Sequence, residues 1–87
     1  MGHSMPVVTF KDNPATKEFE ERAKNILKAE LKRKGITYAE LAMKLADIGV
    51  TETERNIANK ISRGGFTAAF LIQCLTVAQC DTISVKL

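Results

Sequence analysis

Histidine, cysteine, proline and tryptophan are all scarce in this chain of 87 residues. It has one histidine, His3, two cysteines, two prolines and no tryptophan. Residues 1–5 are interpreted as a tag remnant followed by a native start at Met5, so His3 is set aside. Without another histidine, we expect no His-based catalysis and no metal site. The sequence also has no Gly-rich phosphate loop and no room for a separate ligand-sensing domain, so we expect no enzyme activity, no small-molecule substrate and no cofactor.

Two further absences bear on location. The sequence contains no run of about 18 apolar residues, so no membrane span is expected. No secretory signal is recognisable, and Cys74 and Cys80 are the only cysteines. We therefore expect a reducing, cytoplasmic setting in which both are free thiols, buried or half-buried, rather than a disulfide.

The net charge of +3 is unevenly distributed. Positions 17–34 hold seven basic and four acidic residues, whereas positions 35–66 hold four of each. The overall charge is therefore weak evidence for nucleic-acid binding. The arrangement of charges within each segment is more informative.

Residues 6–87 are expected to form a single domain in which four helices follow one another. Thr16 is predicted to cap a first long helix that Gly35 ends. Thr37 and Glu40 match a capping box, which predicts a second helix of about ten residues before Gly49. Apolar spacing assigns the inward faces of these two helices to Phe19, Ala23, Ile26, Leu27, Leu31, Leu41, Ala42 and Leu45.

The third helix is predicted to begin between positions 52 and 54, with Thr51 or Thr53 as its cap. It turns Ile57, Ala58 and Ile61 inward, and Gly64 and Gly65 end it. A fourth, almost wholly apolar helix covers positions 68–78 and requires cover on several sides, part of it from a second copy. Short β-prone segments at 6–10 and 82–87 are free to pair within one chain or across a dimer.

Two short helices joined by a tight connection form the geometry that places one helix in the major groove of DNA. The third helix carries three bases and no acid between positions 55 and 63. Arginine can form a fork of hydrogen bonds to guanine, and asparagine can do so to adenine. The exposed polar side chains of this helix are Arg55, Asn56, Asn59, Lys60 and Arg63.

The segment Lys34–Leu45 (K-G-I-T-Y-A-E-L-A-M-K-L) resembles the Cro and lambda-repressor type of helix-turn-helix domain. Asn59–Gly64 (N-K-I-S-R-G) resembles the end of that family's recognition helix, and the likeness covers roughly positions 24–78. The K-I-S-R-G-G-F stretch also resembles a group of small bacterial domains of unknown function. The resemblance implies an all-α, four- to five-helix, lambda-repressor-like DNA-binding domain, here with β-prone segments at both termini.

Carried over by position, the resemblance implies a bacterial transcriptional regulator that binds a specific double-stranded DNA sequence. It acts as a homodimer, which we expect to form through the fourth helix and the terminal segments. The expected base contacts are Arg55, Asn56, Asn59 and Lys60. The expected contacts to the DNA backbone are Thr37, Tyr38, Lys44, Arg63 and Gly64.

Two features favour an alternative. The turn over Ile48–Thr53 is about two residues longer than in that family, and Glu52 and Glu54 lie where acids repel phosphate. The alternative is a helix-turn-helix-derived interaction or dimerisation module that does not bind DNA. RNA binding is a weaker option, because no aromatic stacking platform is visible.

Overall fold

The computed structural model describes residues 13–85, and four helices make up most of them. They are α1 (Pro14–Lys34), α2 (Tyr38–Asp47), α3 (Glu54–Arg63) and α4 (Ala68–Val77). No strand occurs between residues 13 and 85, so the expectation of an all-helical domain is confirmed for this range.

Each helix begins at a side chain that accepts hydrogen bonds from its first-turn amides. Thr37 and Glu40 form the predicted capping box of α2, in which each side chain accepts from the other residue's backbone N–H. Thr53, not Thr51, caps α3, and its hydroxyl accepts from the amide of Asn56. Thr67 caps α4 in the same way. The short helices therefore start where their local chemistry predicts.

The start of α1 corrects the sequence prediction. Asn13, rather than Thr16, is the cap: its side-chain oxygen accepts from the amides of Ala15 at 2.8 Å and Thr16 at 3.4 Å. Pro14 follows as the first helical residue, where its missing N–H costs nothing because that group would have no partner inside the helix. Helix α1 therefore begins at Pro14, two residues before Thr16.

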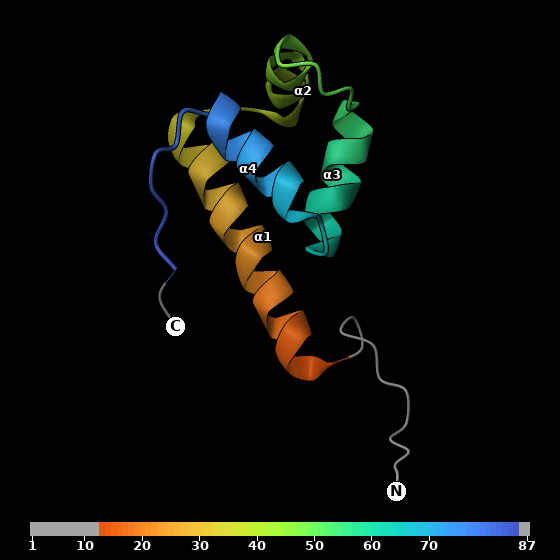
Figure 1. Cartoon of the computed structure of the whole chain (residues 1–87), viewed down its shortest axis with the longest axis vertical. Coiled ribbons are helices and arrows are strands. Elements are labelled where there is room, and N and C mark those ends of the chain that lie inside the picture. Colours follow the sequence, from red (N-terminus) through yellow and green to blue (C-terminus); the bar gives the residue numbers. More distant parts are fainter. Residues whose placement is uncertain (1–12, 86–87) are drawn as a thin grey trace, which may run out of the picture.

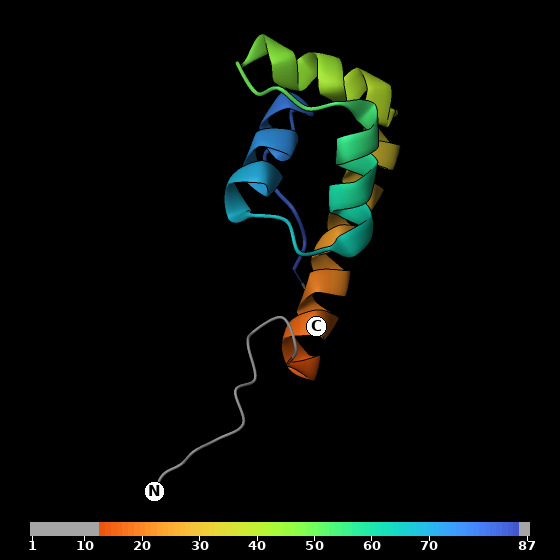
Figure 2. The same cartoon turned by 90° about the vertical axis from the view of Figure 1, so that its right-hand side faces the viewer.

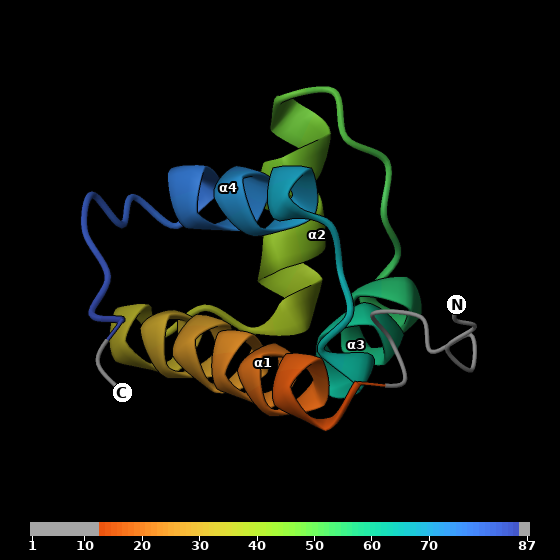
Figure 3. The ribbon, with the colours of Figure 1, turned by 60° about the horizontal axis from the view of Figure 1, so that its bottom comes forward.

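The core joins all four helices. Helix α1 packs against α3 and α4, and α2 packs against the same two helices from the other end (Figure 1). Figure 3 shows α4 running in the same direction as α1, with α2 crossing behind α4. The buried apolar residues are Leu27, Leu31, Leu41, Leu45, Ile57, Ile61, Phe70, Cys74, Leu75 and Ala78.

These positions confirm most of the predicted inward faces, with one exception. Phe19 is 52% exposed and lies at the edge of the core rather than within it. No described helix combines the length and the apolarity needed to cross a membrane.

The residues after α4 return along α1 toward its N-terminal end (Figure 1). The ammonium group of Lys34 donates to the carbonyl of Gln79 at 3.1 Å, and the thiol of Cys80 donates to the carboxylate of Glu30 at 3.4 Å. Residues 82–85, predicted to be β-prone, form no strand with the described part of the chain. The other predicted β segment, 6–10, lies outside the described residues.

Candidate nucleic-acid interface

The outer face of α3 carries a stripe of exposed polar side chains, made of Arg55, Asn56, Asn59 and Arg63. With about 100° between successive residues, these four positions fall within about 100° of arc. Arg55 and Arg63 are eight residues apart, which is about 12 Å along the helix axis. Within residues 13–85, neither guanidinium forms an ion pair, so both are available to an outside partner. We call these four residues the α3 stripe.

The surroundings of the stripe can be followed in Figure 2. Helix α3, the start of α2 and α1 lie on one side of the molecule, and α4 lies on the other. The two predicted contact elements, α2 and α3, are therefore brought together. The opposite side belongs to α4.

The two glutamates near the start of α3 have different positions. Glu52 is almost buried, with its side chain 10% exposed, and forms an ion pair with Lys60. Glu54 is exposed at the first position of α3. Helical geometry puts it on the far side of the axis from the centre of the α3 stripe. Neither carboxylate therefore adds a free negative charge to the stripe.

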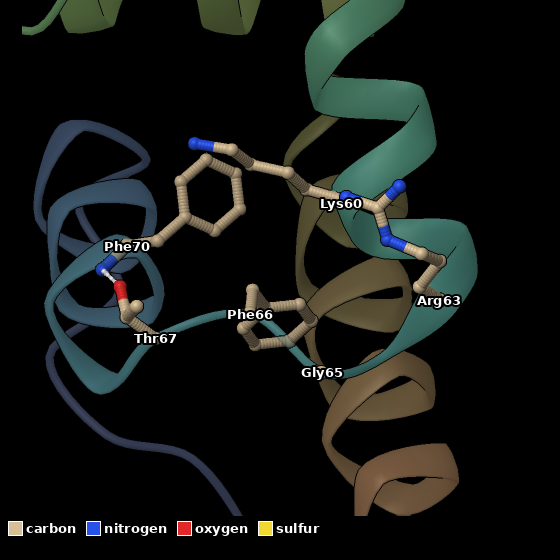
Figure 4. Close-up of a pocket in the computed structure, with 6 residues that line it drawn as sticks. All are labelled: Lys60, Arg63, Gly65, Phe66, Thr67 and Phe70. Atoms are coloured by element: carbon tan, nitrogen blue, oxygen red, sulfur yellow. Dashed lines mark hydrogen bonds between the residues drawn. The ribbon is translucent and has the colours of Figure 1, made fainter. Parts of the chain in front are cut away.

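Lys60 has a structural partner on each side. Besides its ion pair with Glu52, its ammonium group lies 5.0 Å from the centre of the Phe70 ring, as Figure 4 shows. The attraction between a cation and an aromatic face adds to that of the ion pair. Lys60, expected to contact a base, is thus directed toward the α2–α3 turn and α4. The sequence offered no signal for this pair, because its members are eight positions apart and on different elements.

A small hollow of about 160 Å³ separates the end of α3 from the start of α4. Arg63 and Lys60 bring positive charge to it, and the rings of Phe66 and Phe70, 5.6 Å apart, form its apolar wall (Figure 4). The Thr67 hydroxyl is already used by the amide of Phe70. Of the two lining cations, Arg63 is the one that forms no ion pair with the described part of the chain.

Gly64 is buried against α1. A Cβ atom there would lie 2.7 Å from the backbone oxygen of Glu20, and φ is +72°, in the left-handed region. Its N–H donates back to Lys60 and Ile61. Gly64, expected to contact the DNA backbone, instead allows the end of α3 to approach α1. The sequence predicted that Gly64 ends the helix but not this contact.

The predicted phosphate contacts on α2 lie at its start and on its outer surface. Thr37 is exposed but its hydroxyl and amide are both used by Glu40, and these hydrogen bonds hold the pKa of the Glu40 carboxyl below its ordinary value. Tyr38 is half-buried against the core. Lys44 is exposed and flanked by Glu40 and Asp47. The charge of Lys44 is therefore partly offset.

Two bases of α1 join Tyr38 at the α1–α2 corner. Lys28 and Lys32 line a groove of about 440 Å³ together with Tyr38, Thr37 and Ile36. Neither lysine is among the DNA contacts expected from the sequence. Their spacing of four residues on α1 is the signal that could have placed them on one side of the helix.

The two thiols lie in α4 and just after it, and both are free, as expected. Cys74 is fully buried, and burial raises the pKa of its thiol to about 12. Cys80 is half-buried. Burial and the neighbouring Glu30 carboxylate raise the pKa of its thiol too. Neither thiol is activated as a nucleophile.

These features define a small all-helical domain with a polar, partly cationic face on α3. Residues 19–83 match the family model described as a domain of unknown function (DUF6471), and the chain belongs to that family. The resemblance to a small family of unknown function is thus confirmed. Comparison with curated proteins and with solved structures finds no match.

Proposed function

We propose that this domain is a sequence-specific double-stranded DNA-binding protein of the lambda-repressor-like helix-turn-helix type. It acts in the bacterial cytoplasm as a transcriptional regulator. The observation that carries the proposal is the α3 stripe: two arginines and two asparagines lie on one face of a short, capped helix, and neither arginine forms an ion pair with residues 13–85. These are the side chains that read guanine and adenine in the major groove.

Roles divide between reading bases and holding phosphates. Arg55, Asn56 and Asn59 face the bases, since they lie toward the start of α3, which enters the groove first in this kind of docking. Arg63, at the far end of the stripe, binds a phosphate. Further phosphate contacts come from Tyr38 and Lys44 on α2 and from Lys28 and Lys32 on α1. Lys60 and Gly64 support the interface from behind, because their contacts are inside the protein.

Selection of binding sites from a random duplex library tests this proposal. We expect an enriched motif for the unaltered protein, and a relaxed base preference for Arg55→Ala and Asn56→Ala, each losing about 1–3 kcal/mol of discrimination at one position. Arg63→Ala should instead weaken binding to all sequences and lower the slope of log affinity against log salt by about 1. Lys17→Ala, which removes an exposed cation near the start of α1, is the control. Recovery of no motif would refute sequence specificity.

Dimerisation belongs to the proposal and rests on α4. Ala69, Ile72 and Thr76 form an exposed, largely apolar edge of this helix, and Ile72 is 59% exposed. A homodimer that pairs these edges covers the apolar surface that the single chain leaves open. Two recognition helices about 34 Å apart would then meet successive major grooves.

The same edge supports a second candidate, an interaction module that dimerises and does not bind DNA. A gel-shift assay with bulk DNA at about 50 mM salt distinguishes the two, because a cationic DNA-binding surface is effective at low salt. A stable dimer that ignores DNA under these conditions would favour the module. Ile72→Lys should abolish the dimer in either case.

A further inference from the structure

An apolar groove of about 190 Å³ lies where α1, α4 and the C-terminal residues meet. Its walls are apolar except for Arg22, whose guanidinium lies 5.5 Å from the centre of the Phe19 ring. Phe19 is 52% exposed and Val85 is 66% exposed, so the rim of the groove presents large apolar side chains to solvent. The residues that line it are Phe19, Arg22, Ala23, Ile26, Leu71, Ile83 and Val85.

We propose that residues 6–10 of the same chain fill this groove, with Val8 and Phe10 as the buried side chains. The segment reads P-V-V-T-F and lies outside the described residues. It directly precedes Asn13, the cap of α1, and Phe19 lies near the start of that helix. The proposal concerns the fold and does not rest on the proposed function.

The reach of the chain fits this assignment. Along α1, Phe19 is about 9 Å and Ala23 about 15 Å beyond Asn13, at about 1.5 Å per residue. An extended chain returning from Asn13 covers about 3.3 Å per residue, which brings Phe10 to about 10 Å and Val8 to about 17 Å. Phe10 and Val8 also point to the same side of an extended segment, whereas Val7 and Thr9 point to the other. The two apolar side chains therefore arrive level with Phe19 and Ala23.

The direction of the chain indicates how the segment packs. Residues 81–85 run antiparallel to α1. A segment that packs along α1 and then leads into its start at Asn13 is also antiparallel to that helix. The two would lie parallel, and a parallel ladder of only two strands is weak. Burial of Val8 and Phe10 is therefore the driving force, rather than strand pairing.

Tethering favours this segment over a second copy of the protein. A segment joined by only a few residues to the helix that forms the groove has an effective concentration in the millimolar range. A second copy at micromolar concentration competes poorly with it. The dimer contact is then left to α4.

Nuclear magnetic resonance on the full chain tests the proposal. We expect nuclear Overhauser effects from the Phe10 ring and Val8 methyls to Phe19, Ala23 and Val85, unchanged on dilution. In a mixed sample of labelled and unlabelled chains, isotope-filtered spectra should lack these signals between chains. Contacts seen only between chains, or no contact from residues 6–10 to the groove, would overturn the proposal.

Stability gives an independent readout. The double variant Val8→Ser and Phe10→Ser should lower Tm by about 4–8 °C, the shift that a small loss of unfolding free energy causes in a domain of this size. Val7→Ser, on the opposite side of the extended segment, is the matched control and should leave Tm unchanged. An equal fall for the control and the double variant, or no fall for either, contradicts the assignment.

Discussion

The ends of α1 and α3 share one backbone conformation in different surroundings. Gly35 ends α1 with φ +69°, and Gly64 ends α3 with φ +72°. A Cβ atom at Gly35 would meet nothing within 4 Å, whereas at Gly64 it would meet the backbone of Glu20. The first glycine is required by its own backbone alone. The second is required also by a helix 44 positions away in the sequence.

The contrast extends to the turns around these ends. The α1–α2 connection is held by neighbours in the sequence, namely Gly35 and the Thr37–Glu40 capping box. The α2–α3 and α3–α4 connections are held by contacts across the fold, from Lys60 to Glu52 and Phe70. Local caps thus start every helix, and the α2–α3 and α3–α4 connections depend on tertiary contacts as well.

The largest expected effect is at Gly64. Gly35→Ala should cost about 1–2 kcal/mol in unfolding free energy, the penalty of a left-handed conformation for a residue with a Cβ. Gly64→Ala should cost about 3–4 kcal/mol, because the backbone of Glu20 must shift as well. Urea denaturation of both variants measures the difference. Equal losses would show that the approach of α3 to α1 is not limited by Gly64.

Two of the three ion pairs within residues 13–85 form the next comparison. Lys60→Met should cost about 1–2 kcal/mol, because it leaves the nearly buried Glu52 carboxylate without its partner. Arg33→Met should change stability less, because Arg33 is 60% exposed and Glu30 keeps the hydrogen bond from the Cys80 thiol. A double-mutant cycle with Glu52→Gln isolates the Lys60 pair.

The same Lys60 variant also tests whether Lys60 supports the interface from inside the protein or contacts DNA. If Lys60 acts only behind the interface, Lys60→Met should leave the salt dependence of DNA binding unchanged, in contrast to Arg63→Ala. A slope reduced by about 1 would instead assign Lys60 to a phosphate.

Caps at the start of α1 give a smaller effect. Asn13→Ala should cost about 1 kcal/mol, since Asn13 supplies the acceptor for two first-turn amides. Thr16→Ala should stay within about 0.5 kcal/mol, because Thr16 is already inside the helix. Thermal or urea denaturation distinguishes them, and a larger loss at Thr16 would restore it as the cap.

The smallest effect is a dependence on pH at the α1–α2 corner. Hydrogen bonds from Thr37 hold the pKa of Glu40 below its ordinary value of 4.5 in the folded state. Their contribution to stability is complete above pH 4.5 and is lost as the pH falls through the lowered pKa. Glu40→Gln should therefore flatten the acid side of the stability profile more than Glu54→Gln does.

The same contrast explains how much the sequence revealed. The helices, the Thr37–Glu40 capping box and the glycine ends depend on residues a few positions apart, so they could be predicted. Asn13 was missed because Thr16 offers the same chemistry three positions later. The Lys60–Glu52 pair and the contact of Gly64 with Glu20 depend on how helices pack, and no local pattern encodes that.

For the candidate site, composition indicated which side chains α3 exposes but not which of them the fold uses. Neither arginine of the α3 stripe forms an ion pair within residues 13–85, whereas Lys60 pairs with Glu52. A lysine and an arginine on one helix look equivalent in sequence. Only the position of Glu52 and Phe70 separates them.

The two thiols differ in burial, so their rates of alkylation report on two different opening motions of the protein. Cys74 is fully buried in the core that all four helices form, so an alkylating reagent reaches it only when that core opens. Cys80 is shielded only in part, at the junction where the chain leaves α4, and becomes reactive when that junction alone loosens. The labelling rate of Cys74 therefore measures global unfolding, and the labelling rate of Cys80 measures fraying of the C-terminal end.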